Sequence, residues 1–167
     1  MDTNAIHGRM ASTAQLYRQA LHDFSAAGLR SGSATGSTLH EAIKCELYAE
    51  ALQTNLLPFP EFQPVGKATL RLDMAWAEDT PAGWQIVAGF EIDKNASPRS
   101  IEKLDNLPKS ARRFLVRFGS GKYRLPHNLL KRCKIEVIDV SAKELDKLTN
   151  KSDITSAKPF DNERITA

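Results

Sequence analysis

Two neighbouring stretches of the sequence, about residues 68–76 and 84–93, alternate apolar and other side chains with a period of two. This period is typical of β-strands that bury one face of a sheet. The segment between them, residues 78–83, contains a proline and a glycine and is typical of a turn. We therefore expect the two strands to pair as an antiparallel hairpin, which restricts the chain to folds built around a sheet.

The alternation assigns the side chains of each strand to two faces. The apolar faces are expected to carry Leu70, Leu72, Met74 and Trp76 in the first strand, and Ile86, Ala88, Phe90 and Ile92 in the second. Asp73 then lies on the opposite face of the first strand, and Glu91 and Asp93 lie on the opposite face of the second. Pairing through the turn would bring these three carboxylates together.

Three clustered carboxylates favour a bound cation. Like charges placed opposite each other in a sheet are destabilising, at roughly 0.2 to 1 kcal/mol per pair. Mg²⁺ prefers carboxylate oxygens and retained water, and it can activate a water for attack on a phosphodiester. Alternatively, the acids lie on a solvated face where Lys67, Arg71 and Lys94 balance them through surface ion pairs. On spacing alone, both interpretations stay open.

The remaining segments predict helices and further strands around this hairpin. The expected helices cover residues 11–29, 38–57, 97–107 and 125–133, and the expected strands cover residues 113–118 and 135–140. Capping and breaking residues mark the boundaries, namely Thr38 and Glu41 in capping-box spacing, Pro58, Pro60, Ser97 and Pro98. This order predicts an α/β fold with a mixed central sheet flanked by helices and with an extra N-terminal helix.

Small and polar stretches divide the chain into three parts. Residues 31–37 are rich in serine and glycine, so residues 1–37 are interpreted as a helix and flexible linker appended to a core domain at residues 38–141. Residues 142–167 predict a polar, largely disordered tail. The chain has no run of about 18 apolar residues and no basic N-terminal leader, and its two cysteines suit free thiols. We therefore expect a cytoplasmic protein that makes no membrane contact.

The segment that follows the acidic residues is strongly basic. Residues 94–134 contain twelve lysines and arginines against two acids, although the whole chain has a net charge of only +3. Such side chains neutralise phosphates and supply most sequence-independent affinity for DNA. The residues expected to contact nucleic acid are Arg99, Lys109, Arg112, Arg113, Lys122 and Arg124. The alternative interpretation is a basic face that serves only solubility.

The sequences RLDMAW at residues 71–76 and IVAGFEIDK at residues 86–94, followed by Ser97 and a helix bearing Lys103, resemble the PD-(D/E)XK nuclease superfamily. The resemblance covers about residues 38–140. It implies a restriction-endonuclease-like αβββαβ core. The first strand of that core would lie near residues 63–67.

The resemblance also implies a role for each site residue. Asp73 and Glu91 would hold the metal, which would be Mg²⁺ or Mn²⁺. Asp93 stands where the family's motif has its lysine and would complete the site, with Lys94 or Lys103 substituting for the missing amine. Because members often supply a carboxylate from the first helix of the core, Glu50 is a further candidate in a partly buried stripe of the second helix.

The expected function is therefore metal-dependent hydrolysis of phosphodiester bonds, as a nuclease acting on DNA and as an endonuclease. The protein would work as a monomer or as a homodimer. One alternative is a nucleic-acid-binding module on the same fold whose catalytic site is degenerate, since the motif lysine is missing. Another is a subunit that recruits a protein partner through its first helix or its tail.

Overall fold

The computed structural model describes residues 2–26, 35–64, 70–119 and 127–141. The described elements, in chain order, are α1 (Thr3–Ala26), α2 (Thr35–Gln53), β1 (Leu57–Phe62), β2 (Leu72–Thr80), β3 (Gly83–Asp93), α3 (Pro98–Asp105), β4 (Arg112–Arg117), α4 (His127–Arg132) and β5 (Ile135–Asp139). The expected tail at residues 142–167 and the greater part of the expected linker lie outside the described residues.

The strands form one mixed sheet in the order β1-β2-β3-β4-β5. β1, β2 and β3 are antiparallel neighbours, and β4 and β5 run parallel to β3. Each parallel step needs a crossover, which α3 and α4 supply between successive strands. The expected hairpin and the expected α/β class with a mixed sheet are thus confirmed.

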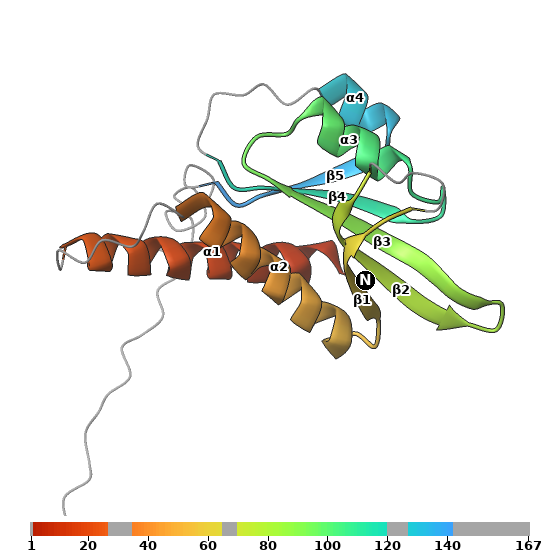
Figure 1. Cartoon of the computed structure of the whole chain (residues 1–167), viewed down its shortest axis with the longest axis horizontal. Helices are drawn as coiled ribbons and strands as arrows, with labels where there is room; N and C mark the ends of the chain where they lie inside the picture. The colour runs from red at the N-terminus through yellow and green to blue at the C-terminus, as the bar shows by residue number, and fades with distance from the viewer. Residues whose placement is uncertain (1, 27–34, 65–69, 120–126, 142–167) are drawn as a thin grey trace, which may run out of the picture.

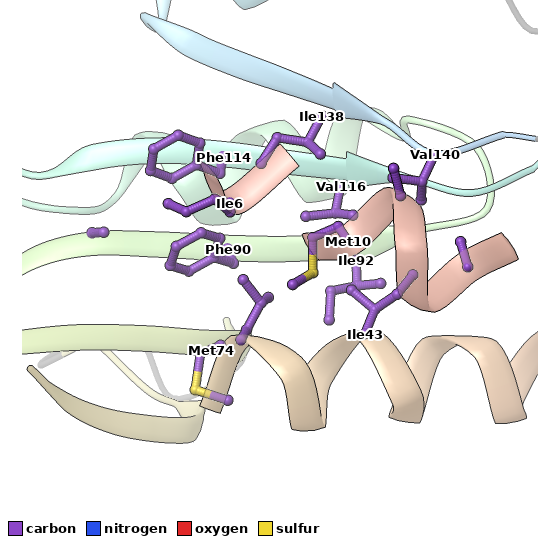
Figure 2. Packing of buried hydrophobic residues seen from close by; sticks show 14 of the residues in the cluster. Ile6, Met10, Ile43, Met74, Phe90, Ile92, Phe114, Val116, Ile138 and Val140 are labelled. Carbon is purple, nitrogen blue, oxygen red and sulfur yellow. The ribbon is translucent and has the colours of Figure 1, made fainter. Parts of the chain in front are cut away.

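Helices cover both faces of this sheet, with α1 and α2 on one face and α3 and α4 on the other (Figure 1). A large core lies between the first pair of helices and the sheet, where Phe90 stacks on Phe114 with ring centroids 4.9 Å apart (Figure 2). A second, smaller core lies under α3 and α4 and includes Ile101, Leu104 and Leu130. In the part of the chain that the structure describes, no helix is long and apolar enough to cross a membrane.

Helix α1 belongs to the large core. Its residues Ile6, Met10 and Ala14 are spaced by four, share one helix face and are fully buried against the sheet and α2 (Figure 2). The expectation that the residues before Thr38 form an appendage is therefore wrong. The helix also begins at Thr3, well before the expected start near residue 11, so that two of these three anchors fell outside the predicted segment.

Helix α2 begins and ends earlier than expected. It starts at Thr35, so Thr38 lies inside its first turn and does not cap it. At the other end, Asn55 adopts a left-handed φ of 58°, and the amide of Leu56 donates to the carbonyl of Ala51 at 2.8 Å. This is the 6→1 bond that closes many helix C-termini, and it directs the chain into a strand soon after the helix.

Strand β1 takes the place of the strand that was expected near residues 63–67. It spans Leu57–Phe62 and contains Pro58 and Pro60. Residues 63 and 64 are not in a strand, and residues 65–67 lie outside the described residues. Prolines are tolerated in β1 because it is an edge strand, where a missing amide leaves no neighbour without a hydrogen bond.

A β-bulge in β3 changes the predicted faces near the turn. The register steps from Trp76 opposite Ala88 to Ala77 opposite Ile86, so that Val87 is an extra residue. Val87 consequently packs against the large core and Ile86 against the smaller one. The expectation that Ile86 shares a face with Ala88 is wrong, because one inserted residue reverses the alternation on one side of it.

Candidate active site

Strands β2 and β3 separate at the end of the hairpin farthest from its turn. The ladder between them ends at Met74 and Phe90. Beyond that pair, the amide of Asp73 donates to Oε1 of Glu91 at 3.3 Å, and the amide of Ile92 donates to Oδ2 of Asp73 at 2.7 Å. Each carboxylate accepts an amide that a continuous ladder would pair with a backbone carbonyl. The structure thus brings Asp73 and Glu91 together in the gap between the two strands.

The position of Leu72 is consistent with the separation of β2 and β3. It was expected to share a face with Met74 and Trp76, but it packs in the smaller core while those two residues pack in the large one. The expectation is wrong for Leu72 because strict alternation of faces requires a regular strand. The change of face falls at Asp73, the residue between Leu72 and Met74.

His40 of α2 is the second partner of Asp73. Its Nε2 lies 3.4 Å from Oδ2 of Asp73, and its Nδ1 lies 3.1 Å from Oε1 of Glu41. The contact with Asp73 raises the pKa of His40, although burial opposes this. Burial alone would raise the pKa of Asp73, but the hydrogen bonds from His40 and from the amide of Ile92 outweigh it and lower that pKa. His40 was not predicted as a site residue, because the four histidines are scattered along the sequence without the spacing of metal ligands.

Lys103 of α3 is the charged partner of Glu91. Its Nζ donates to both carboxylate oxygens, at 2.8 and 3.1 Å. The pair is enclosed, with 4% of the Glu91 side chain and 19% of the Lys103 side chain exposed. Burial, together with the charge of Asp73, raises the pKa of Glu91 to about 7, and Lys103 opposes this rise only in part. Of the two lysines considered, Lys103 is therefore the one whose amine contacts Glu91.

The third predicted acid, Asp93, does not join the carboxylate pair. Its oxygens accept from the amides of Asn95 and Ser97 at 3.1 and 3.2 Å and from the hydroxyl of Ser100 at 2.7 Å. Ser97 is itself the N-cap of α3, as the sequence predicted. Asp93 therefore fixes the start of the helix that carries Lys103, and it acts on the site through that helix.

Two further candidates lie away from the site. The side chain of Lys94 is exposed, and only its backbone carbonyl has a described partner, the amide of Gly119 at 3.0 Å. Glu50 is buried and paired with Nε of Arg9 at 2.8 Å. It follows His40 by ten residues, which corresponds to about 15 Å along a helix. Glu50 therefore links α2 to α1 and does not reach Asp73.

The predicted nucleic-acid contacts divide into three groups. Arg99 and Lys109 are exposed on the α3 side of the sheet, where Lys131, Arg132 and Lys134 are also exposed. Arg112 is bound by Glu136, and the buried guanidinium of Arg113 donates to the carbonyls of Leu104, Leu107, Pro108 and Ala111. Lys122 and Arg124 lie outside the described residues. The basic surface thus consists of the exposed cations of α3, α4 and their loops, and Arg113 serves the fold.

Asp73 and Glu91 are the residues of this site that could ligate a divalent cation, and Lys103 contacts both oxygens of Glu91. Among the described residues, no three histidine, cysteine, aspartate or glutamate side chains gather closely enough to hold a metal ion. Mg²⁺ commonly needs only one or two carboxylates, because water and substrate phosphate complete its shell. Asp73 and Glu91 satisfy that smaller requirement.

Comparison of the chain with models of known protein families, with curated proteins and with solved structures gave no match.

Proposed function

We propose that this chain is a Mg²⁺- or Mn²⁺-dependent nuclease of the PD-(D/E)XK type that hydrolyses phosphodiester bonds in DNA. The observation that carries the proposal is the pair of partly buried Asp73 and buried Glu91 at the point where β2 and β3 separate, with Lys103 bonded to Glu91. An aspartate, a glutamate and a lysine in one enclosed gap form the set of groups that the sequence resemblance implies.

The order of elements supports the same proposal. From α2 to β4 the chain runs helix, three antiparallel strands, helix and a strand parallel to the third. This is the αβββαβ order of the restriction-endonuclease-like core. The displacement of the lysine from β3 to α3 fits within that order, because α3 packs directly against β3 (Figure 1).

Each residue of the site has a chemical role in this proposal. Asp73 and Glu91 would hold the cation, which supplies charge stabilisation at the phosphoryl group and an activated water. Lys103 neutralises Glu91 before substrate binds, and its amine can then donate to a phosphoryl oxygen or orient the attacking water. His40 orients the carboxylate of Asp73. The exposed cations of α3 and α4 would bind the flanking phosphates.

A nucleic-acid-binding module without catalysis is the second candidate function. It is favoured by the contact of Lys103 with both oxygens of Glu91, which occupies the carboxylate that a metal would need. The two functions share the basic surface and differ in whether the carboxylate pair is used.

Cleavage assays with matched variants separate the two functions. Supercoiled plasmid and single-stranded DNA would be incubated with the full chain in Mg²⁺, Mn²⁺ or EDTA. We expect metal-dependent cleavage that falls about a hundredfold or more in Asp73→Asn, Glu91→Gln and Lys103→Met. Lys94→Met, which removes a neighbouring exposed amine, should retain activity. If the protein binds DNA but shows no cleavage activity that is lost in Asp73→Asn, the nuclease proposal is contradicted and the binding module is favoured.

A further inference from the structure

A small apolar cavity lies beside the carboxylate pair, between α2 and the β1-β2 edge of the sheet. It is largely open to solvent and has a volume of about 280 Å³, just below the range of volumes of small-molecule sites. Its lining consists of Glu41, Lys44, Cys45, Tyr48, Pro60 and Met74. Tyr48 is 43% exposed and forms an aromatic wall at the opening, whereas Met74 is fully buried.

The cavity lies close to the site, because the charge of Asp73 is among the causes that raise the pKa of Lys44 in its lining. Two other lining residues are sequence neighbours of site residues: Met74 follows Asp73 in β2, and Glu41 follows His40 in α2. His40, Lys44 and Tyr48 are spaced by four residues, so they form a stripe along one face of α2. This stripe leads from the carboxylate of Asp73 to the aromatic wall over about 12 Å of helix.

Lys44 of the cavity lining is linked to a second cation, Arg71, through a shared glutamate. Lys44 and Arg71 both pair with Glu61 of β1, which turns away from regular strand geometry at a φ of 54°. The Arg71 side chain is 63% exposed, so it can exchange Glu61 for a phosphate. The region therefore offers an apolar and aromatic pocket next to cationic groups, which is complementary to a base attached to its phosphate.

We propose that this cavity holds one unpaired nucleobase of the strand that is cut, and that the substrate is single-stranded or locally unpaired DNA. The inference rests on the proposed function, since it takes the scissile phosphate to lie at Asp73 and Glu91. A base within a duplex is stacked and paired and cannot enter the cavity without leaving the helix. Because the lining is mainly apolar, the site stacks the base and reads little of its sequence.

A larger groove of about 670 Å³ between α1 and α2 serves as an internal comparison. It shares Glu41 and Cys45 with the cavity, and Tyr17 lines it as Tyr48 lines the other. Among the described residues, its lining includes two glutamates and no lysine or arginine. The larger groove thus has a tyrosine in its lining but lacks the neighbouring cations of the cavity. Substitution of Tyr17 is therefore the matched control for substitution of Tyr48.

The test measures binding by fluorescence anisotropy in EDTA, using the full chain, a labelled oligothymidylate and a duplex of the same length. We expect tighter binding of the single strand. Tyr48→Ala should weaken that binding about tenfold, Tyr48→Phe should restore it, and Tyr17→Ala should leave it unchanged. Circular dichroism verifies that the variants are folded. Equal affinity for strand and duplex, or a Tyr48→Ala variant that binds like wild type, would overturn the proposal.

Alkylation of Cys45 tests whether the strand covers the part of α2 that the cavity and the larger groove share, and the Tyr48 and Tyr17 variants decide between the two. Cys45 is exposed in the lining, whereas Cys133 is buried and provides the unreactive reference. Bound oligothymidylate should slow the reaction of Cys45 with iodoacetamide several-fold, and an unchanged rate would contradict the site. Plasmid cleavage measured in parallel separates the two proposals. Cleavage that depends on Asp73 but not on Tyr48 would support the nuclease and contradict the base site. Binding that depends on Tyr48, without any cleavage, would contradict the nuclease and support only a site that binds a base.

Discussion

Replacing Glu91 with glutamine should remove much of the pH dependence of stability between pH 4.5 and 7. The pKa of Glu91 is about 7 in the folded protein and 4.5 in its unperturbed form. Between these values the folded state binds more protons than the unfolded state, so the stability contributed by neutral Glu91 is fully present below pH 4.5 and is lost as the pH rises through 7. The difference of 2.5 pKa units corresponds to about 3 kcal/mol.

The variant should accordingly be more stable than wild type at pH 8, by up to about 3 kcal/mol, and nearly equal to it at pH 4.5. Urea unfolding at several pH values measures this, with tryptophan fluorescence as the signal because Trp76 is fully buried. The pKa of His40 is also raised, so its contribution is likewise lost as the pH rises. It remains in both proteins, and the difference between their pH profiles therefore isolates Glu91.

Lys103→Met provides the opposite perturbation. Lys103 lowers the pKa of Glu91, so its removal should move the loss of stability to higher pH and make it larger. The reasoning would be refuted if the free energy of unfolding changed with pH in the same way in wild type and Glu91→Gln. It would also be refuted if wild type became more stable relative to the variant between pH 5 and 7. Under the proposed function, cleavage should also rise with pH through about 7, as Glu91 ionises.

Three further predictions concern residues that the structure assigns to the fold. Arg113→Met should lower the free energy of unfolding by about 3 kcal/mol, because the guanidinium bonds four buried or partly buried carbonyls; a loss of DNA affinity at unchanged stability would contradict this. Asp93→Ala should cost about 2 kcal/mol and reduce cleavage only in part, measured by thermal unfolding and plasmid assay, and complete inactivation of a folded variant would place it in the site. Arg9→Met should cost about 1 to 2 kcal/mol by leaving Glu50 unpaired, and adding Glu50→Gln should recover most of that loss in urea unfolding.

Local patterns in the sequence were sufficient for most elements of the sheet and for the start of α3. The hairpin, the cap at Ser97 and the strands β4 and β5 depend on neighbouring residues, on alternation and on capping chemistry, so they can be read without knowledge of the fold. Asp73 and Glu91 came close together because both lie near the same end of one hairpin. The bulge at Val87 and the early end of α2 have no comparably strong local signal, since they depend on how each segment packs.

The partners of the two carboxylates were decided by tertiary structure alone. His40 is 33 residues from Asp73, and only the packing of α2 on the sheet brings its ring to that carboxylate. Asp93 occupies the position of the motif lysine, and Lys94 or Lys103 was expected to substitute for the missing amine. The placement of α3 brings the amine of Lys103 to Glu91 and uses the carboxylate of Asp93 as a helix anchor. Charge and spacing define which groups are available in a chain, but the angle at which a helix crosses a sheet determines which of them meet.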